Sequence, residues 1–107
     1  MTILLQVLEQ SFRPTTPWER RTFTFVSTER ITAMRLDGEY GVWLDLARPG
    51  ESQRLAHTRT HEEAIYFLLS TFNKIAECEE AGGSWVIGHD GATIASMVAT
   101  RFPLIEH

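Results

Sequence analysis

Three histidines, His57, His61 and His89, are the residues whose type and spacing could support metal or acid–base chemistry. His57 and His61 are four residues apart, and two histidines at that spacing can share a metal ion when both lie on one face of a helix. Thr60, however, is a natural N-cap, which leaves His57 outside the helix and breaks the shared face. A small-ligand or metal-assisted site around the three histidines therefore stands as an alternative to the function inferred below.

The sequence carries none of the spacings that mark common catalytic or cofactor sites. It has no Gly-x-Ser-x-Gly for a nucleophile, and its glycines form neither a phosphate-binding loop nor a dinucleotide fingerprint. The pair His89-Asp90 falls in a predicted tight turn, where adjacent side chains point in different directions. Cys78, the single cysteine, is expected to be a packed, unreactive thiol, because the acidic end of a helix disfavours the thiolate. We therefore expect no enzyme activity, no cofactor and no metal.

Two groups of side chains are placed where they do not help an isolated fold. Glu77, Glu79 and Glu80 crowd the last turns of a predicted helix, where the helix dipole disfavours each negative charge by about 0.3–1 kcal/mol. Trp18 in a connector and Phe67 beside the main apolar stripe of that helix are large groups of the kind that dominates protein interfaces. Two structural explanations stay open, since the acids can pair with arginines on a neighbouring strand and Phe67 can pack in the core. We interpret the five residues as candidate protein-binding residues.

The charge pattern argues against nucleic acid as the partner. The net charge is −4, and a phosphate backbone needs a basic stripe. Acids at 19, 29, 37 and 39 interleave the arginines of the first predicted strands and largely cancel their field. These arginines are Arg20, Arg21, Arg30 and Arg35. Nucleic-acid binding is thus the last of the functional hypotheses.

Periodicity and turn residues predict the elements that position these side chains. Residues 3–12 place their polar side chains on one side of a helix, and Pro14 would end it. Strands are expected near 21–27, 30–36 and 42–46, with a two-residue turn at Asp37-Gly38 pairing Ala33 with Val42. A short edge strand is expected at 53–58, and a second hairpin is expected at 84–88 and 92–99 around Asp90-Gly91.

The clearest signals define a helix over residues 61–81. Thr60 and Glu63 form a capping box, and Gly82-Gly83 follow the last turn. One apolar stripe is expected to face the core, with Phe72 at its centre; its members are Ile65, Leu68, Leu69, Phe72, Ile75 and Ala76. A second stripe beside it holds Ala64, Phe67, Thr71 and Cys78.

Together these elements predict a single α+β domain over residues 1–107. It would have a mostly antiparallel sheet of about five strands, one long helix and a short N-terminal helix, in the order α-β-β-β-α-β-β. This order resembles that of class I secretion chaperones, although the chain lacks their C-terminal helix. The hydrophobic fraction of 43% supports a continuous core, and the sequence shows no membrane span and no secretory signal. The single cysteine fits a reducing compartment, so we expect a cytoplasmic protein.

The functional hypothesis is a non-enzymatic protein-binding module that acts as a homodimer or on another protein. Immunity proteins, phage or plasmid anti-defence inhibitors and secretion chaperones are small acidic α+β proteins of this kind.

Overall fold

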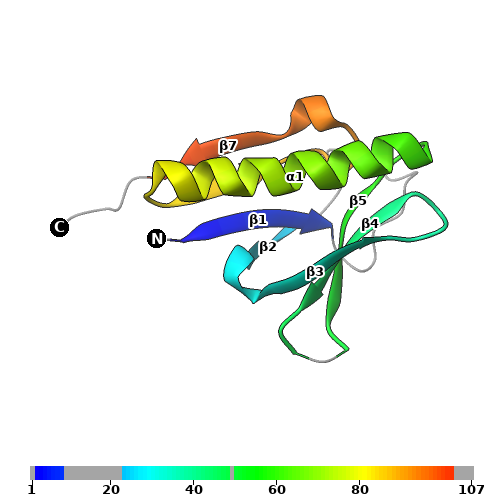
Figure 1. The fold of residues 1–107 in the computed structure, drawn as a ribbon, viewed down its shortest axis with the longest axis horizontal. Coiled ribbons are helices and arrows are strands. Elements are labelled where there is room, and N and C mark those ends of the chain that lie inside the picture. Colours follow the sequence, from blue (N-terminus) through cyan, green and yellow to red (C-terminus); the bar gives the residue numbers. More distant parts are fainter. Residues whose placement is uncertain (1, 9–22, 49, 103–107) are drawn as a thin grey trace.

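The structure, a computed structural model, describes residues 2–8, 23–48 and 50–102, and these residues form seven strands and one long helix (Figure 1). The strands are β1 (Ile3–Leu8), β2 (Phe23–Ser27), β3 (Ile31–Leu36), β4 (Gly41–Leu46), β5 (Ser52–His57), β6 (Trp85–Gly88) and β7 (Val98–Arg101). The helix is α1 (His61–Ala81), and two short 3-10 helices, η2 (Thr28–Arg30) and η3 (Ile94–Ser96), precede β3 and β7. The α+β class is confirmed, whereas the count of five strands and the order starting with a helix are wrong. The resemblance in element order to secretion chaperones is lost with that order.

The predicted N-terminal helix is instead strand β1. Ile3, Leu5 and Val7 are buried and alternate with the half-buried Leu4 and Gln6, which is the period of a strand. The strand pairs with β2 from Leu4 to Leu8 and with β6 from Ile3 to Leu5. The face of β1 that holds Leu4 and Gln6 is half-buried, and a half-buried face can carry an apolar residue. The run Ile3-Leu4-Leu5 therefore suits this strand, although it breaks simple alternation.

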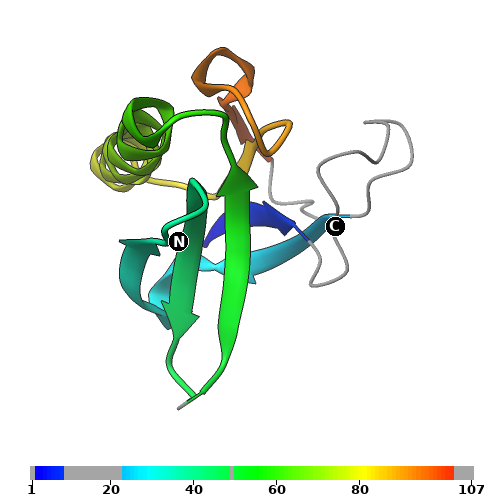
Figure 2. The ribbon, with the colours of Figure 1, turned by 90° about the vertical axis from the view of Figure 1, so that its right-hand side faces the viewer.

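The sheet is organised around β1. The hydrogen-bonded order is β3-β4-β5-β1-β6-β7, with β2 branching off as a further partner of β1. All pairs are antiparallel except β1 with β6. The expected edge strand, β5, is in fact internal, because it lies between β4 and β1. Figure 2, which looks nearly along α1, shows the helix on one side of this curled sheet.

The ends of α1 confirm the predicted helix. The Thr60 side chain accepts a hydrogen bond from Glu63 N at 3.1 Å, and the Glu63 carboxylate accepts one from Arg59 N at 3.1 Å. Gly82 and Gly83 end the helix with φ angles of 73° and 86°, which glycine adopts without strain.

The faces of α1 are the reverse of those predicted. The buried helix residues are Ala64, Phe67, Thr71 and Cys78. The expected core stripe is largely exposed, and Phe72 at its centre is 63% exposed. Only Leu68 and Ile75 of that stripe pack partly against the core. Thr71 shows how the less apolar stripe can be buried, since its hydroxyl donates to the Phe67 carbonyl at 2.8 Å and needs no water.

Both predicted hairpins form with longer turns. Leu36 pairs with Val42 instead of the predicted pair Ala33 and Val42, because Asp37 organises a wider turn. Its carboxylate accepts from Glu39 N and Gly41 N at 2.8 Å each and from Trp43 Nε1 at 2.6 Å. In the second hairpin Ile87 pairs with Ala99, since η3 lies within the connection.

Candidate functional site

The three histidines occupy different environments. His57 ends β5 and is half-buried, His61 is the exposed first residue of α1, and His89 is buried. His57 N donates to the Gly91 carbonyl at 2.7 Å, which holds the end of β5 against the turn after β6. In the described part of the chain, no three His, Cys, Asp or Glu side chains come together in an arrangement that could hold a metal ion.

His89 is a core residue whose two ring nitrogens are both occupied. Nδ1 accepts from Gly91 N at 2.9 Å, so the ring proton lies on Nε2, which donates to the Gln6 carbonyl at 2.6 Å. The ring also packs edge-on against Phe67, with 5.2 Å between ring centres. Burial lowers the pKa of His89, outweighing the Gln6 carbonyl and the Asp90 charge that raise it. A neutral, fully bonded imidazole holds β1, α1 and the β6 end together, and its position does not suit proton transfer to a substrate.

Asp90 also has a structural role. Its Oδ1 accepts from Ala92 N and Thr93 N at 2.8 Å each, and its Oδ2 accepts from Thr93 Oγ1 at 2.8 Å. Burial opposes ionisation of this carboxyl, but the Thr93 and Ala92 amides and the Thr93 and Ser96 hydroxyls lower its pKa. His89 and Asp90 therefore both stabilise the connection between β6 and β7.

The candidate protein-binding residues do not form one surface. Trp18 lies outside the described residues. Phe67 is fully buried, so its side chain has no surface to offer a partner. Glu77, Glu79 and Glu80 are exposed, and Glu77 pairs with Lys74 on the same helix at 3.6 Å. Arg101 on β7 donates to the Gly82 carbonyl at 2.9 Å, so an arginine from a neighbouring strand does reach this helix end.

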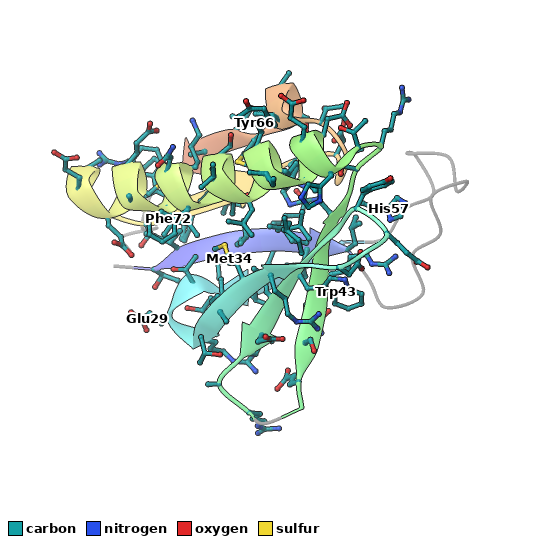
Figure 3. All side chains as sticks on the ribbon, turned by 45° about the vertical axis from the view of Figure 1, so that its right-hand side comes forward. Glu29, Met34, Trp43, His57, Tyr66 and Phe72 are labelled. Carbon is teal, nitrogen blue, oxygen red and sulfur yellow. The ribbon has the colours of Figure 1, made fainter. Side chains whose placement is uncertain are left out.

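A row of exposed apolar side chains runs along one flank of α1. Ile65 is 36%, Leu69 49% and Phe72 63% exposed, and these three residues are called the α1 flank below. Their spacing of four and three residues puts them on one face of the helix. Glu79 is seven residues beyond Phe72 and continues that face for two more turns. Figure 3 places Phe72 on the side of α1 nearest Met34 of β3. Tyr66, which is also exposed, is three residues before Leu69 and therefore lies beside the flank.

Two of the arginines near β3 are paired with acids. Arg30 pairs with Glu51 and Arg35 with Asp45, each at 3.2 Å. Arg35 and Arg54 lie over the Trp43 ring, with guanidinium carbons 5.4 and 4.7 Å from its centre. Arg20 and Arg21 lie outside the described residues. The charges of Arg30 and Arg35 are thus each offset by a carboxylate, which does not favour a basic stripe on these strands.

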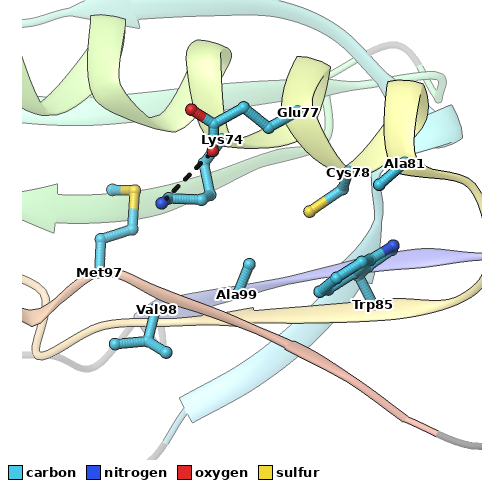
Figure 4. A pocket seen from close by; sticks show the side chains of 8 residues that line it. All are labelled: Lys74, Glu77, Cys78, Ala81, Trp85, Met97, Val98 and Ala99. Atoms are coloured by element: carbon cyan, nitrogen blue, oxygen red, sulfur yellow. Dashed lines mark ion pairs between the residues drawn. The ribbon is translucent and has the colours of Figure 1, made fainter.

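A pocket of about 490 Å³ lies on the other side of α1, between the helix and strands β6 and β7 (Figure 4). Most of its lining is apolar: Cys78, Ala81, Trp85, Met97, Val98 and Ala99. Lys74 and Glu77 complete it and also line a smaller, more polar hollow of about 260 Å³ beside Ser70 and Asn73. Burial raises the pKa of the Cys78 thiol, as do Glu77 and Glu79, against the lowering effect of Lys74. The thiol is therefore protonated at neutral pH and serves as part of the wall.

The sequence patterns predicted neither the α1 flank nor the pocket. The flank was assigned to the core because it holds the larger apolar residues. The pocket had one available signal: Lys74 and Cys78, the only lysine and the only cysteine of the chain, are four residues apart and so share a helix face. The remaining wall comes from residues 85–99, which only the fold brings to that face.

Among the described residues, no helix has both the length and the apolar composition needed to cross a membrane. Comparisons with models of protein families, with curated proteins and with solved structures found no match.

Proposed function

We propose that this protein is a non-enzymatic protein-binding module that uses the α1 flank to bind a protein partner or a second copy of itself. The exposure of Ile65, Leu69 and Phe72 in one row is the observation that supports this function most directly. Single exposed apolar side chains are ordinary in soluble proteins, whereas a contiguous row on one helix face is typical of a contact surface. Immunity proteins, anti-defence inhibitors and secretion chaperones are classes that such a small acidic module fits.

Burial of the α1 flank would contribute part of the energy that recognition of a partner requires. Full burial of one large apolar side chain is worth about 1.5–3 kcal/mol. A partner that covers the exposed parts of three such side chains gains on the order of 3 kcal/mol from them alone. Contact with a partner would also remove from water Phe72, the aromatic side chain of α1 with the highest exposed fraction.

The acids at the end of α1 favour a partner that carries basic groups beside its apolar contact. Glu79 and Glu80 are exposed and follow the flank toward the helix end, whereas Glu77 is paired with Lys74. A lysine or arginine of a partner would offset the unfavourable position of these carboxylates at the negative end of the helix dipole. Of the five candidate protein-binding residues predicted from the sequence, we therefore retain Glu79 and Glu80 for this role.

Two variants on one helix test the surface with a matched control. Leu69→Glu with Phe72→Glu places charges on the flank, and Ser70→Glu places one on the other side of α1, beside the smaller hollow. Self-association is measured by sedimentation velocity, and binding by the amount of the wild type's co-purifying partner that each variant retains. We expect the flank variant to lose association about tenfold or more, which corresponds to ~1.4 kcal/mol, while its melting temperature stays close to that of Ser70→Glu. Equal association by the two variants would place the interface elsewhere.

A further inference from the structure

The pocket between α1 and strands β6 and β7 has the size and lining of a small-molecule site. Its volume of about 490 Å³ lies within the range of ligand pockets, about 300–1,000 Å³. Cys78 and Ala81 face Trp85 and Ala99 across it, and Met97 closes one end (Figure 4). The wall is supplied by a helix and a paired strand, so the space does not depend on a single loop.

The charge in the pocket comes from one ion pair, and its two members differ in depth. The Lys74 side chain is 32% exposed and the Glu77 side chain 69%, with 3.6 Å between Nζ and Oε2. The cation therefore lies deeper than the anion. An i,i+3 pair on a helix surface contributes only about 0.2–0.5 kcal/mol, so Glu77 can turn into water at little cost and leave the ammonium to a ligand.

The negative end of α1 is partly capped beside the pocket, by donors from β6 and β7. Trp85 Nε1 and the Arg101 guanidinium each donate to the Gly82 carbonyl at 2.9 Å. The Arg101 guanidinium also lies over the Trp85 ring, 4.9 Å from its centre, and fixes the indole as a wall. A bound molecule thus meets an apolar surface along its body and one cation at its head.

We propose that this pocket binds a small amphipathic carboxylate, with its hydrocarbon or aryl body against Cys78, Trp85, Met97 and Ala99 and its carboxylate on Lys74. The site is separate from the α1 flank, and its occupancy does not depend on the proposed protein binding.

Three eight-carbon probes that differ only in the head group separate charge from apolar contact: octanoate, octylamine and octan-1-ol. Affinity is measured by calorimetry, and the site is located from amide shifts in heteronuclear NMR spectra. We expect octanoate to bind about tenfold or more tightly than either other probe, with shifts confined to residues 70–101 near the pocket. Octanoate should also slow alkylation of Cys78 by N-ethylmaleimide, which is readable by mass because the chain has no other cysteine.

Variants distinguish a site from general apolar adsorption. Lys74→Gln should weaken octanoate about fivefold or more and leave octan-1-ol unchanged, whereas Glu62→Gln, at the other end of α1, should change neither. Ala99→Leu fills the pocket and should abolish octanoate binding, and Ala81→Leu at the helix end serves the same purpose if the strand variant fails to fold. Binding of octylamine or octan-1-ol as tight as that of octanoate, shifts spread over the surface, or no octanoate binding would each overturn the assignment.

Discussion

At the scale of single residues, His89 is held in its neutral form by its hydrogen bonds. Nδ1 accepts from Gly91 N, and Nε2 donates to the Gln6 carbonyl. A second proton on Nδ1 would point at the Gly91 N–H, and the charged ring would lie in the core beside Phe67. Protonation therefore favours the unfolded chain.

This arrangement predicts a loss of stability in mild acid. Burial lowers the pKa of His89 in the folded state below its ordinary value of 6.5. Its contribution is fully present above the unfolded value and is lost as the pH falls below it toward the folded pKa. The free energy of unfolding, measured with urea from about pH 7.5 to about pH 5.5, should fall with a slope of up to about 1.4 kcal/mol per pH unit for this one proton.

One histidine variant assigns that slope. His89→Gln should flatten the dependence of unfolding free energy on pH in this range, even if it lowers stability at every pH. An unchanged slope in His89→Gln would show that another group titrates.

At the scale of the element, two phenylalanines of α1 report which face is buried. Phe67 is fully buried, and Phe72 is 63% exposed. We expect Phe67→Ala to lower the free energy of unfolding by about 3–5 kcal/mol and Phe72→Ala to lower it by less than about 1 kcal/mol. Urea unfolding of both variants at one pH is the measurement, and the reverse ranking would mean that the flank faces the core.

The helix illustrates which local features sequence can predict. Its ends depend on Thr60, Glu63 and Gly82, which act within a few residues of themselves, and they were predicted from those residues. Its faces depend on what packs against them. Two adjacent stripes were apolar enough to be buried, and the smaller residues Ala64 and Thr71 let the helix approach the sheet, a contact that no local pattern encodes.

In the strands, too, some features follow from local sequence and others depend on residues that are distant in the chain. β3 and β4 follow from alternation around Asp37-Gly38, but the turn is longer because Asp37 bonds Trp43 on the next strand. β1 was misread because Leu4, on its half-buried face, breaks the alternation of apolar and polar residues, and because its pairing with β2 and β6 is not encoded locally. His89 likewise depends on Gln6, 83 residues away.

At the scale of the whole molecule, α1 separates two surfaces of different character. The flank, on the β3 side, is a convex apolar row that continues toward acids, and it suits a protein. The pocket, on the β7 side, is concave with one cation, and it suits a small anion. Protein binding and the use of Glu79 and Glu80 remain hypotheses drawn from the sequence, whereas the flank and the pocket depend on how the helix is rotated on the sheet.

Site-specific photo-crosslinking along α1 tests the proposed protein interface most directly. A benzophenone amino acid is placed at 65, 69 and 72 on the flank and at 70 on the other side of α1, and the chain is irradiated in its source cells. We expect one discrete adduct, of the chain with itself or with one other protein, from the three flank positions and none from position 70. Adducts from position 70 alone, or equal adducts from all four positions, would contradict binding through the α1 flank.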